Sequence, residues 1–115
     1  MDQELLDKAT TVIRRNFDNP DFDMNMLAAE LNMGRSKMFT RLKEVVGLTP
    51  NEFTLKLKLE EALRMLQEAP PYNISEISYQ LGFASPRYLS RCFKDFYGVS
   101  PLSYRKETSN EAESK

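Results

Sequence analysis

The stretch KDFYGVSPLSY at Lys94–Tyr104 repeats the stretch KEVVGLTPNEF at Lys43–Phe53, 51 residues earlier in the chain. Lys, Gly and Pro recur unchanged, and one acidic, one apolar, one hydroxyl and one aromatic position recur conservatively. Glycine commonly ends a helix, and a Thr-Pro or Ser-Pro pair commonly starts one, because the hydroxyl caps the helix and Pro is favoured at its first position. The repeat therefore predicts the same helix boundary twice.

The repeat extends upstream of this phrase. Leu27 and Leu31 recur 50 residues later as Ile77 and Leu81, and from Met38 onward the interval is 51. Each copy reads as a short helix, a turn with glycine, a longer helix, and then Gly-x-Thr/Ser-Pro. This is the layout of a helix-turn-helix motif, whose second helix can enter the major groove of DNA.

The chain as a whole is predicted to be all-α. No segment alternates between polar and apolar residues at period two, so we expect about seven helices and no sheet. A long linker helix at residues 50–67 is expected to join a first helix-turn-helix lobe at residues 1–49 to a second lobe at residues 68–106. The polar residues 107–115 lack periodicity, which predicts a disordered tail.

Composition excludes several classes of site. The 115 residues include one cysteine, Cys92, and no histidine, which rules out an internal disulfide and leaves no residue set for zinc, an iron–sulfur cluster or a nucleophile–His pair. We therefore expect no cofactor, no metal and no enzyme activity. No apolar run approaches the roughly 18 residues that span a membrane, so no membrane contact is expected, and the cysteine usage fits the reducing cytoplasm.

The net charge of −1 hides an uneven distribution. Residues 31–66 carry seven basic and four acidic side chains, and residues 85–106 carry five basic and one acidic. Each of these two basic islands contains one copy of the repeat, in a chain that is otherwise acidic. The pattern predicts a polarised surface rather than a neutral one.

The second helix of each copy is expected to have a buried stripe and an opposite basic face. The buried stripes are predicted to be Met38, Leu42 and Val45 in the first copy, and Leu89, Phe93 and Phe96 in the second. Arg can bond guanine with two donors, Ser or Thr can bond several bases, and Phe can pack on a thymine methyl. The base-contact candidates are Ser36, Phe39, Thr40, Arg87, Ser90 and Arg91, and the phosphate-contact candidates are Arg35, Lys37, Lys43 and Lys94.

Two alternatives compete with DNA contact. Basic residues on an exposed helix face are most often only solvated. Against that, residues 35–43 hold four basic side chains and residues 87–94 hold three, with no acid in either run, and Phe39 is expected to be exposed within such a face. The other alternative is a helical protein-interaction module that docks an acidic partner through the same basic faces.

The segment ISEISYQLGFASPRYLSRCFKDFYGVSPLSYR at Ile74–Arg105 resembles the DNA-binding domain of the AraC/XylS family of transcription regulators. The stretch LAAELNMGRSKMFTRLKEVVGLTPNEF and the linker pattern from Ala62 to Leu66 are similar to the family as well, so the resemblance covers about residues 5–106. Gly34 and Lys58 depart from it, where Ser and Arg are usual.

The resemblance implies a cytoplasmic, sequence-specific transcription regulator that binds double-stranded DNA, with base contacts at the candidate positions above. It also implies RNA polymerase as a partner and, as in hybrid sensor regulators, a sensing domain in a longer parent chain. A linker helix at residues 50–67 would be about 27 Å long at 1.5 Å per residue, and successive major-groove faces lie about 34 Å apart. We therefore expect one chain to place two recognition helices in successive major grooves.

Overall fold

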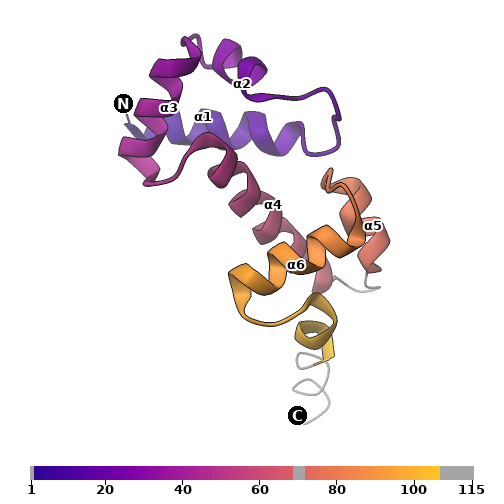
Figure 1. The fold of residues 1–115 in the computed structure, drawn as a ribbon. Helices are drawn as coiled ribbons and strands as arrows, with labels where there is room; N and C mark the ends of the chain where they lie inside the picture. Colours follow the sequence, from indigo (N-terminus) through magenta and orange to yellow (C-terminus); the bar gives the residue numbers. More distant parts are fainter. Residues whose placement is uncertain (1, 69–71, 107–115) are drawn as a thin grey trace. The chain divides into compact units, whose positions relative to one another are not determined.

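The structure is a computed structural model that describes residues 2–68 and 72–106. All regular structure in these two ranges is helical (Figure 1). Helices α1 to α6 are followed by a short helix at residues 101–106, which makes seven within the described ranges. The predicted all-α fold and its number of helices are confirmed, whereas the predicted tail at 107–115 lies outside the described residues.

The chain divides into two compact units, Met1–Lys58 and Leu59–Lys115. The division falls inside α4, which is one continuous helix of 17 residues, Pro50–Leu66. The Thr49 backbone N–H donates to Glu52 Oε1 at 2.9 Å, and the Glu52 N–H donates to Thr49 Oγ1 at 3.2 Å. These two bonds form a capping box at the predicted Thr-Pro helix start, and the hydrogen bonds from Thr49 lower the pKa of Glu52.

The first unit begins with α1 (Asp2–Arg15), α2 (Met24–Glu30) and α3 (Arg35–Val46), which pack on one another. Asp23 caps α2 by accepting from the Met26 N–H at 2.9 Å. Helix α3 ends at Gly47, whose φ of 83° is in the left-handed region that glycine tolerates. The core of this unit consists of Ala9, Val12, Ile13, Leu27, Ala28, Leu31, Met38, Leu42, Phe53 and Leu57.

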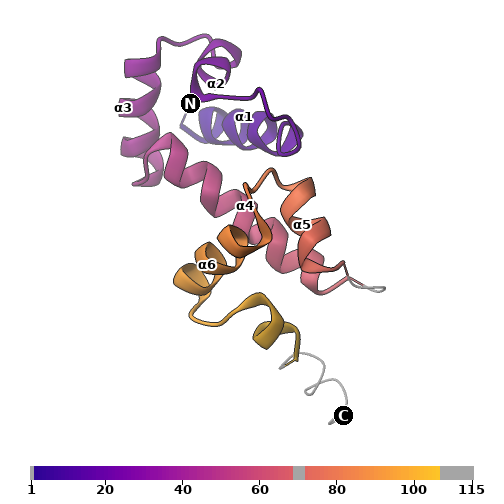
Figure 2. The same ribbon diagram turned by 45° about the vertical axis from the view of Figure 1, so that its right-hand side comes forward.

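The second unit contains α5 (Ile74–Gln80) and α6 (Pro86–Tyr97), which pack on each other (Figure 2). Asn73 and Glu76 form a capping box at the start of α5, and Ser85 caps α6 by accepting from the Tyr88 N–H at 3.0 Å. Gly98 ends α6 with a φ of 84°, as Gly47 ends α3. The buried apolar residues here are Leu59, Ala62, Met65, Leu66, Ile77, Leu81, Leu89 and Phe93.

In each recognition helix, one residue that was predicted to lie on the buried stripe is not fully buried. Phe96 was expected to be buried but is 49% exposed. The stripe advances by four residues from Leu89 to Phe93, so its next member is Tyr97, which is half-buried with its ring centroid 4.7 Å from that of Phe93. Val45, the repeat counterpart of Phe96, is likewise only half-buried.

Candidate nucleic-acid interface

Helix α3 exposes part of its predicted base-contact face. Ser36 and Thr40 are exposed, and the Thr40 hydroxyl donates to the Ser36 backbone carbonyl at 3.1 Å. Because that bond uses the hydroxyl hydrogen, Thr40 Oγ1 keeps lone pairs that can accept from the amino group of adenine or cytosine. Lys37 and Lys43, on the same helix, are also exposed.

Phe39 differs from its expected exposure. Its ring is half-buried and packs against the core of the first unit. The exposed Arg35, one turn earlier, places its guanidinium carbon 5.8 Å from the centroid of this ring. This distance is within the range of a cation–π contact.

Arg41 belongs to the basic run of α3 but is directed elsewhere. Its guanidinium donates to Asp2 Oδ1 of α1 at 2.8 Å and lies 3.4 Å from Glu44 Oε2. The Arg41–Asp2 pair joins residues 39 apart in sequence, so no local pattern could have revealed it. The cations that remain on the recognition face of α3 are Arg35, Lys37 and Lys43.

Helix α6 presents a face of a different composition. Arg87, Arg91 and Lys94 are exposed, and Ser90 beside them is half-buried. None of the three cations makes a hydrogen bond or ion pair within the described residues, so their donors are available to a ligand.

The other flank of α6 carries Tyr88 and Cys92. The hydrogen bond between their side chains is the largest cause that raises the pKa of Tyr88. Cys92 is half-buried.

The support behind α6 comes from the helix at residues 101–106. The ring centroid of Tyr104 lies 6.2 Å from that of Phe93. The Tyr104 hydroxyl accepts a hydrogen bond from Gln67 Nε2 at 2.6 Å. The Arg105 guanidinium donates to the Tyr72 carbonyl. These contacts hold α6 from behind and leave its cationic face uncovered.

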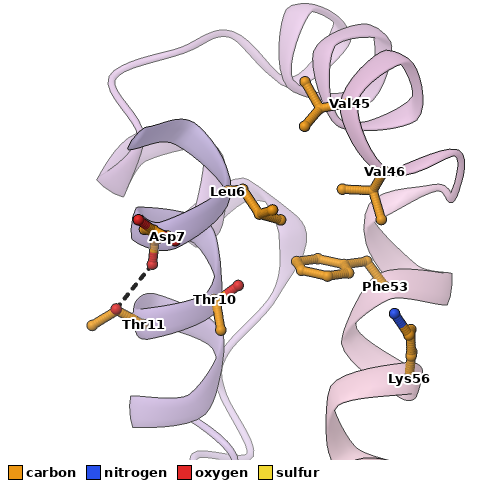
Figure 3. A pocket seen from close by; sticks show the side chains of 8 residues that line it. All are labelled: Leu6, Asp7, Thr10, Thr11, Val45, Val46, Phe53 and Lys56. Carbon is orange, nitrogen blue, oxygen red and sulfur yellow. Dashed lines mark hydrogen bonds between the residues drawn. The ribbon is translucent and has the colours of Figure 1, made fainter. Parts of the chain in front are cut away.

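A groove of about 590 Å³ lies in the first unit beside the end of α3 (Figure 3). Leu6 of α1, Val46 of α3 and Phe53 of α4 face one another across it, and Lys56 lies at its side. The other lining residues are Asp7, Thr10, Thr11 and Val45. None of the predicted DNA-contact residues lines this groove.

Within residues 2–68 and 72–106, no group of three or more His, Cys, Asp or Glu side chains could hold a metal ion. No helix in those ranges is both long enough and apolar enough to cross a bilayer.

Each unit thus contains a short helix, a tight turn and a longer helix whose uncovered face is cationic. Such a pair of motifs defines a double helix-turn-helix DNA-binding domain.

Comparison with known proteins agrees with this class. Residues 27–107 match the model of a family described as a helix-turn-helix domain. The chain is 37% identical over 111 residues to histidine kinase P4 of Formosa agariphila, covering 96% of this chain and 8% of the kinase. It is 33% identical over 98 residues to the HTH-type transcriptional regulator MtrA of Neisseria gonorrhoeae, covering 84% of this chain and 32% of MtrA.

Solved structures show the same fold. An AraC-type transcriptional regulator from Chromobacterium violaceum superimposes with a TM-score of 0.83 at 23% identity, covering 91% of this chain and 92% of that one. The DNA-binding domain of AdpA, solved in complex with a target DNA, gives a TM-score of 0.78 at 26% identity, covering 96% and 94%. The chain belongs to the helix-turn-helix domain family and has the fold of AraC-type DNA-binding domains.

Proposed function

We propose that this domain binds DNA sequence-specifically, with α3 and α6 in successive major grooves. The observation that carries the proposal is the uncovered cationic face of α6, with Arg87, Arg91 and Lys94 exposed and unpaired within the described residues. Cations held on a core-packed helix with no internal partner are poised to bond phosphates and base edges.

The proposed roles follow from exposure and position. Ser36 and Thr40 on α3, and Arg87 and Arg91 on α6, face base edges, because N-terminal residues of a recognition helix reach the bases. Ser90 and Phe39 are half-buried and lie at the margins of those faces. Lys37, Lys43 and Lys94 approach phosphates.

The length of α4 supports a reading of two grooves by one chain. Its 17 residues form an unbroken helix, about 26 Å long at 1.5 Å per residue. One motif precedes α4 in the chain and the other follows it, and successive major grooves are about 34 Å apart. We therefore infer that a single chain binds a site with two elements about 10 bp apart.

The wider assignments rest on the relatives. The chain spans 8% of histidine kinase P4 and 32% of MtrA, so we propose that a longer parent chain supplies a sensing domain. We propose further that the domain acts on DNA inside the cell, and that RNA polymerase is the protein partner of the DNA-bound domain. The domain itself is proposed to have no enzyme activity, and DNA is its ligand.

The rival function is docking of an acidic protein through the same cationic faces. Both functions use the same side chains, but only DNA releases condensed counterions from a polyphosphate backbone. A selected DNA site should be bound with a log–log salt slope of about −5, which corresponds to roughly six phosphate contacts. Binding of that site by fluorescence anisotropy, at salt concentrations from low to physiological, tests this. A flat salt dependence would favour the protein-docking function.

A further inference from the structure

The start of α3 carries an arginine that the protein itself orients. The Arg35 guanidinium lies 5.8 Å from the centroid of the Phe39 ring, and Phe39 packs against the core of the first unit. Arg35 is exposed and makes no hydrogen bond or ion pair in the described part of the chain. Its donors are thus unused, while its charged group lies over a ring that is itself packed on the core.

A guanidinium held over a ring is prepared for bidentate bonding. The cation–π contact uses no N–H donor, so it is compatible with hydrogen bonds from the same group to a base. Holding the side chain before DNA arrives reduces the rotamer freedom that binding must remove. Arg35 is also the first residue of α3, and the N-terminal residues of a recognition helix reach base edges.

Resting on the proposed function, we propose that Arg35 is a base reader that donates to a guanine edge, and that Phe39 is the positioning residue that orients it. This assignment differs from the sequence prediction, in which Phe39 touches a base and Arg35 a phosphate. It is peculiar to the first motif. The repeat counterparts of the pair in α6 are Pro86 and Ser90, which cannot form such a contact.

A double-mutant cycle on the selected DNA site tests the pair. Arg35→Ala should weaken binding of the preferred site about 5- to 150-fold and relax the preference at one base position. Phe39→Leu keeps an apolar side chain on the core but removes the ring face, and should cost about two- to fivefold at the same base position. In the Arg35→Ala background, Phe39→Leu should have no further effect. Phe39→Tyr, which keeps the ring, should retain wild-type binding.

The neighbouring cation Lys37 is the matched control, because it is exposed on the same turn and no ring contact is recorded for it. Lys37→Ala should weaken all base variants alike, and its effect should add to that of Phe39→Leu. Thermal melting of each variant confirms that α3 remains folded.

Three outcomes would overturn the pairing. Full additivity of Phe39→Leu and Arg35→Ala would mean that Phe39 contacts DNA by itself. An equal loss for Arg35→Ala on every base variant would make Arg35 a phosphate contact. No loss for Arg35→Ala would mean that it does not contact DNA.

The proposed function is judged separately, since wild-type binding and the response to Arg91→Ala in α6 do not depend on this pair. Absence of wild-type binding would overturn both.

Discussion

The two units share one order of helices but differ in how they fill the space beside the recognition helix. In the second unit, the ring centroid of Phe93 lies 4.7 Å from that of Tyr97 and 6.2 Å from that of Tyr104. The first unit has smaller side chains at two of these three repeat positions, and two of the counterparts, Val46 and Phe53, line a groove of about 590 Å³. The counterparts are Leu42, Val46 and Phe53.

The recognition faces differ as well. On α6, Arg87 and Arg91 are unpaired within the described residues. On α3, Arg41 is bonded to Asp2, and Arg35 lies over Phe39. The terminal glycines and the buried stripe are thus repeated, while the exposed positions have diverged. Under the proposed function, we therefore expect each motif to bind a different element of the DNA site.

The largest expected effect concerns the two cores. Phe93 and Leu42 are repeat counterparts and both are fully buried. Phe93→Ala should lower the free energy of unfolding by about 3–5 kcal/mol, and Leu42→Ala by about 2–5 kcal/mol. Phe93→Ala should be the more costly, because it also removes two ring contacts. Urea denaturation followed by circular dichroism measures both. A greater loss for Leu42→Ala would show that the unit with the groove is the more tightly packed.

The next largest effect distinguishes Arg91 from its repeat counterpart Thr40 in DNA binding. Arg91→Ala should cost about 1–3 kcal/mol of binding free energy on the preferred site and relax selection at one base position. Thr40→Ala, at the repeat counterpart, should cost less binding free energy, because Thr40 has one hydroxyl rather than a charged guanidinium with several N–H donors. Anisotropy titrations with the preferred site and its single-base variants measure this difference. An equal loss for Arg91→Ala on every variant would remove Arg91 from the base readers.

Two lysines should behave alike in spite of the divergent faces. Lys43 and Lys94 occupy the same place in the repeated phrase and are both exposed. Lys43→Ala and Lys94→Ala should each weaken binding uniformly across sequences and reduce the salt slope by about one. Titrations at two salt concentrations are sufficient. A base-selective effect of either change would make that lysine a reader.

The smallest expected effect lies at the two caps. Ser85 accepts a hydrogen bond from the backbone of α6, whereas Gly34 gives α3 no side-chain cap. Ser85→Ala should cost about 1 kcal/mol of unfolding free energy, and Gly34→Ser should add a few tenths. Gly34→Ser can give this gain in stability without strain, because the φ of Gly34 is −69° and an added Cβ meets nothing within 4 Å. Thermal melting compares the two. A loss of stability in Gly34→Ser would contradict this account of the α3 start.

The elements that could be predicted from sequence are those with local causes. The cap of α4 at Thr49 and the glycines that end α3 and α6 depend on residues a few positions apart, so the repeated phrase was enough to place them. The exposed cations of α6 followed from helical periodicity.

What the sequence could not reveal depends on tertiary contacts. The Arg41–Asp2 pair joins two helices, and the groove is lined by three. Phe39 was expected to be exposed because its packing on the core is not visible in the periodicity of α3. Phe96 was placed on the buried stripe of α6, although Tyr97 continues the four-residue spacing.

The central claim is that one chain reads two grooves. The most direct test is hydroxyl-radical footprinting of a selected minimal site, combined with the protein-to-DNA ratio of the same complex from native mass spectrometry. The account predicts two protected elements about 10 bp apart with one protein chain bound. Two chains on the minimal site, each protecting one element, would contradict it.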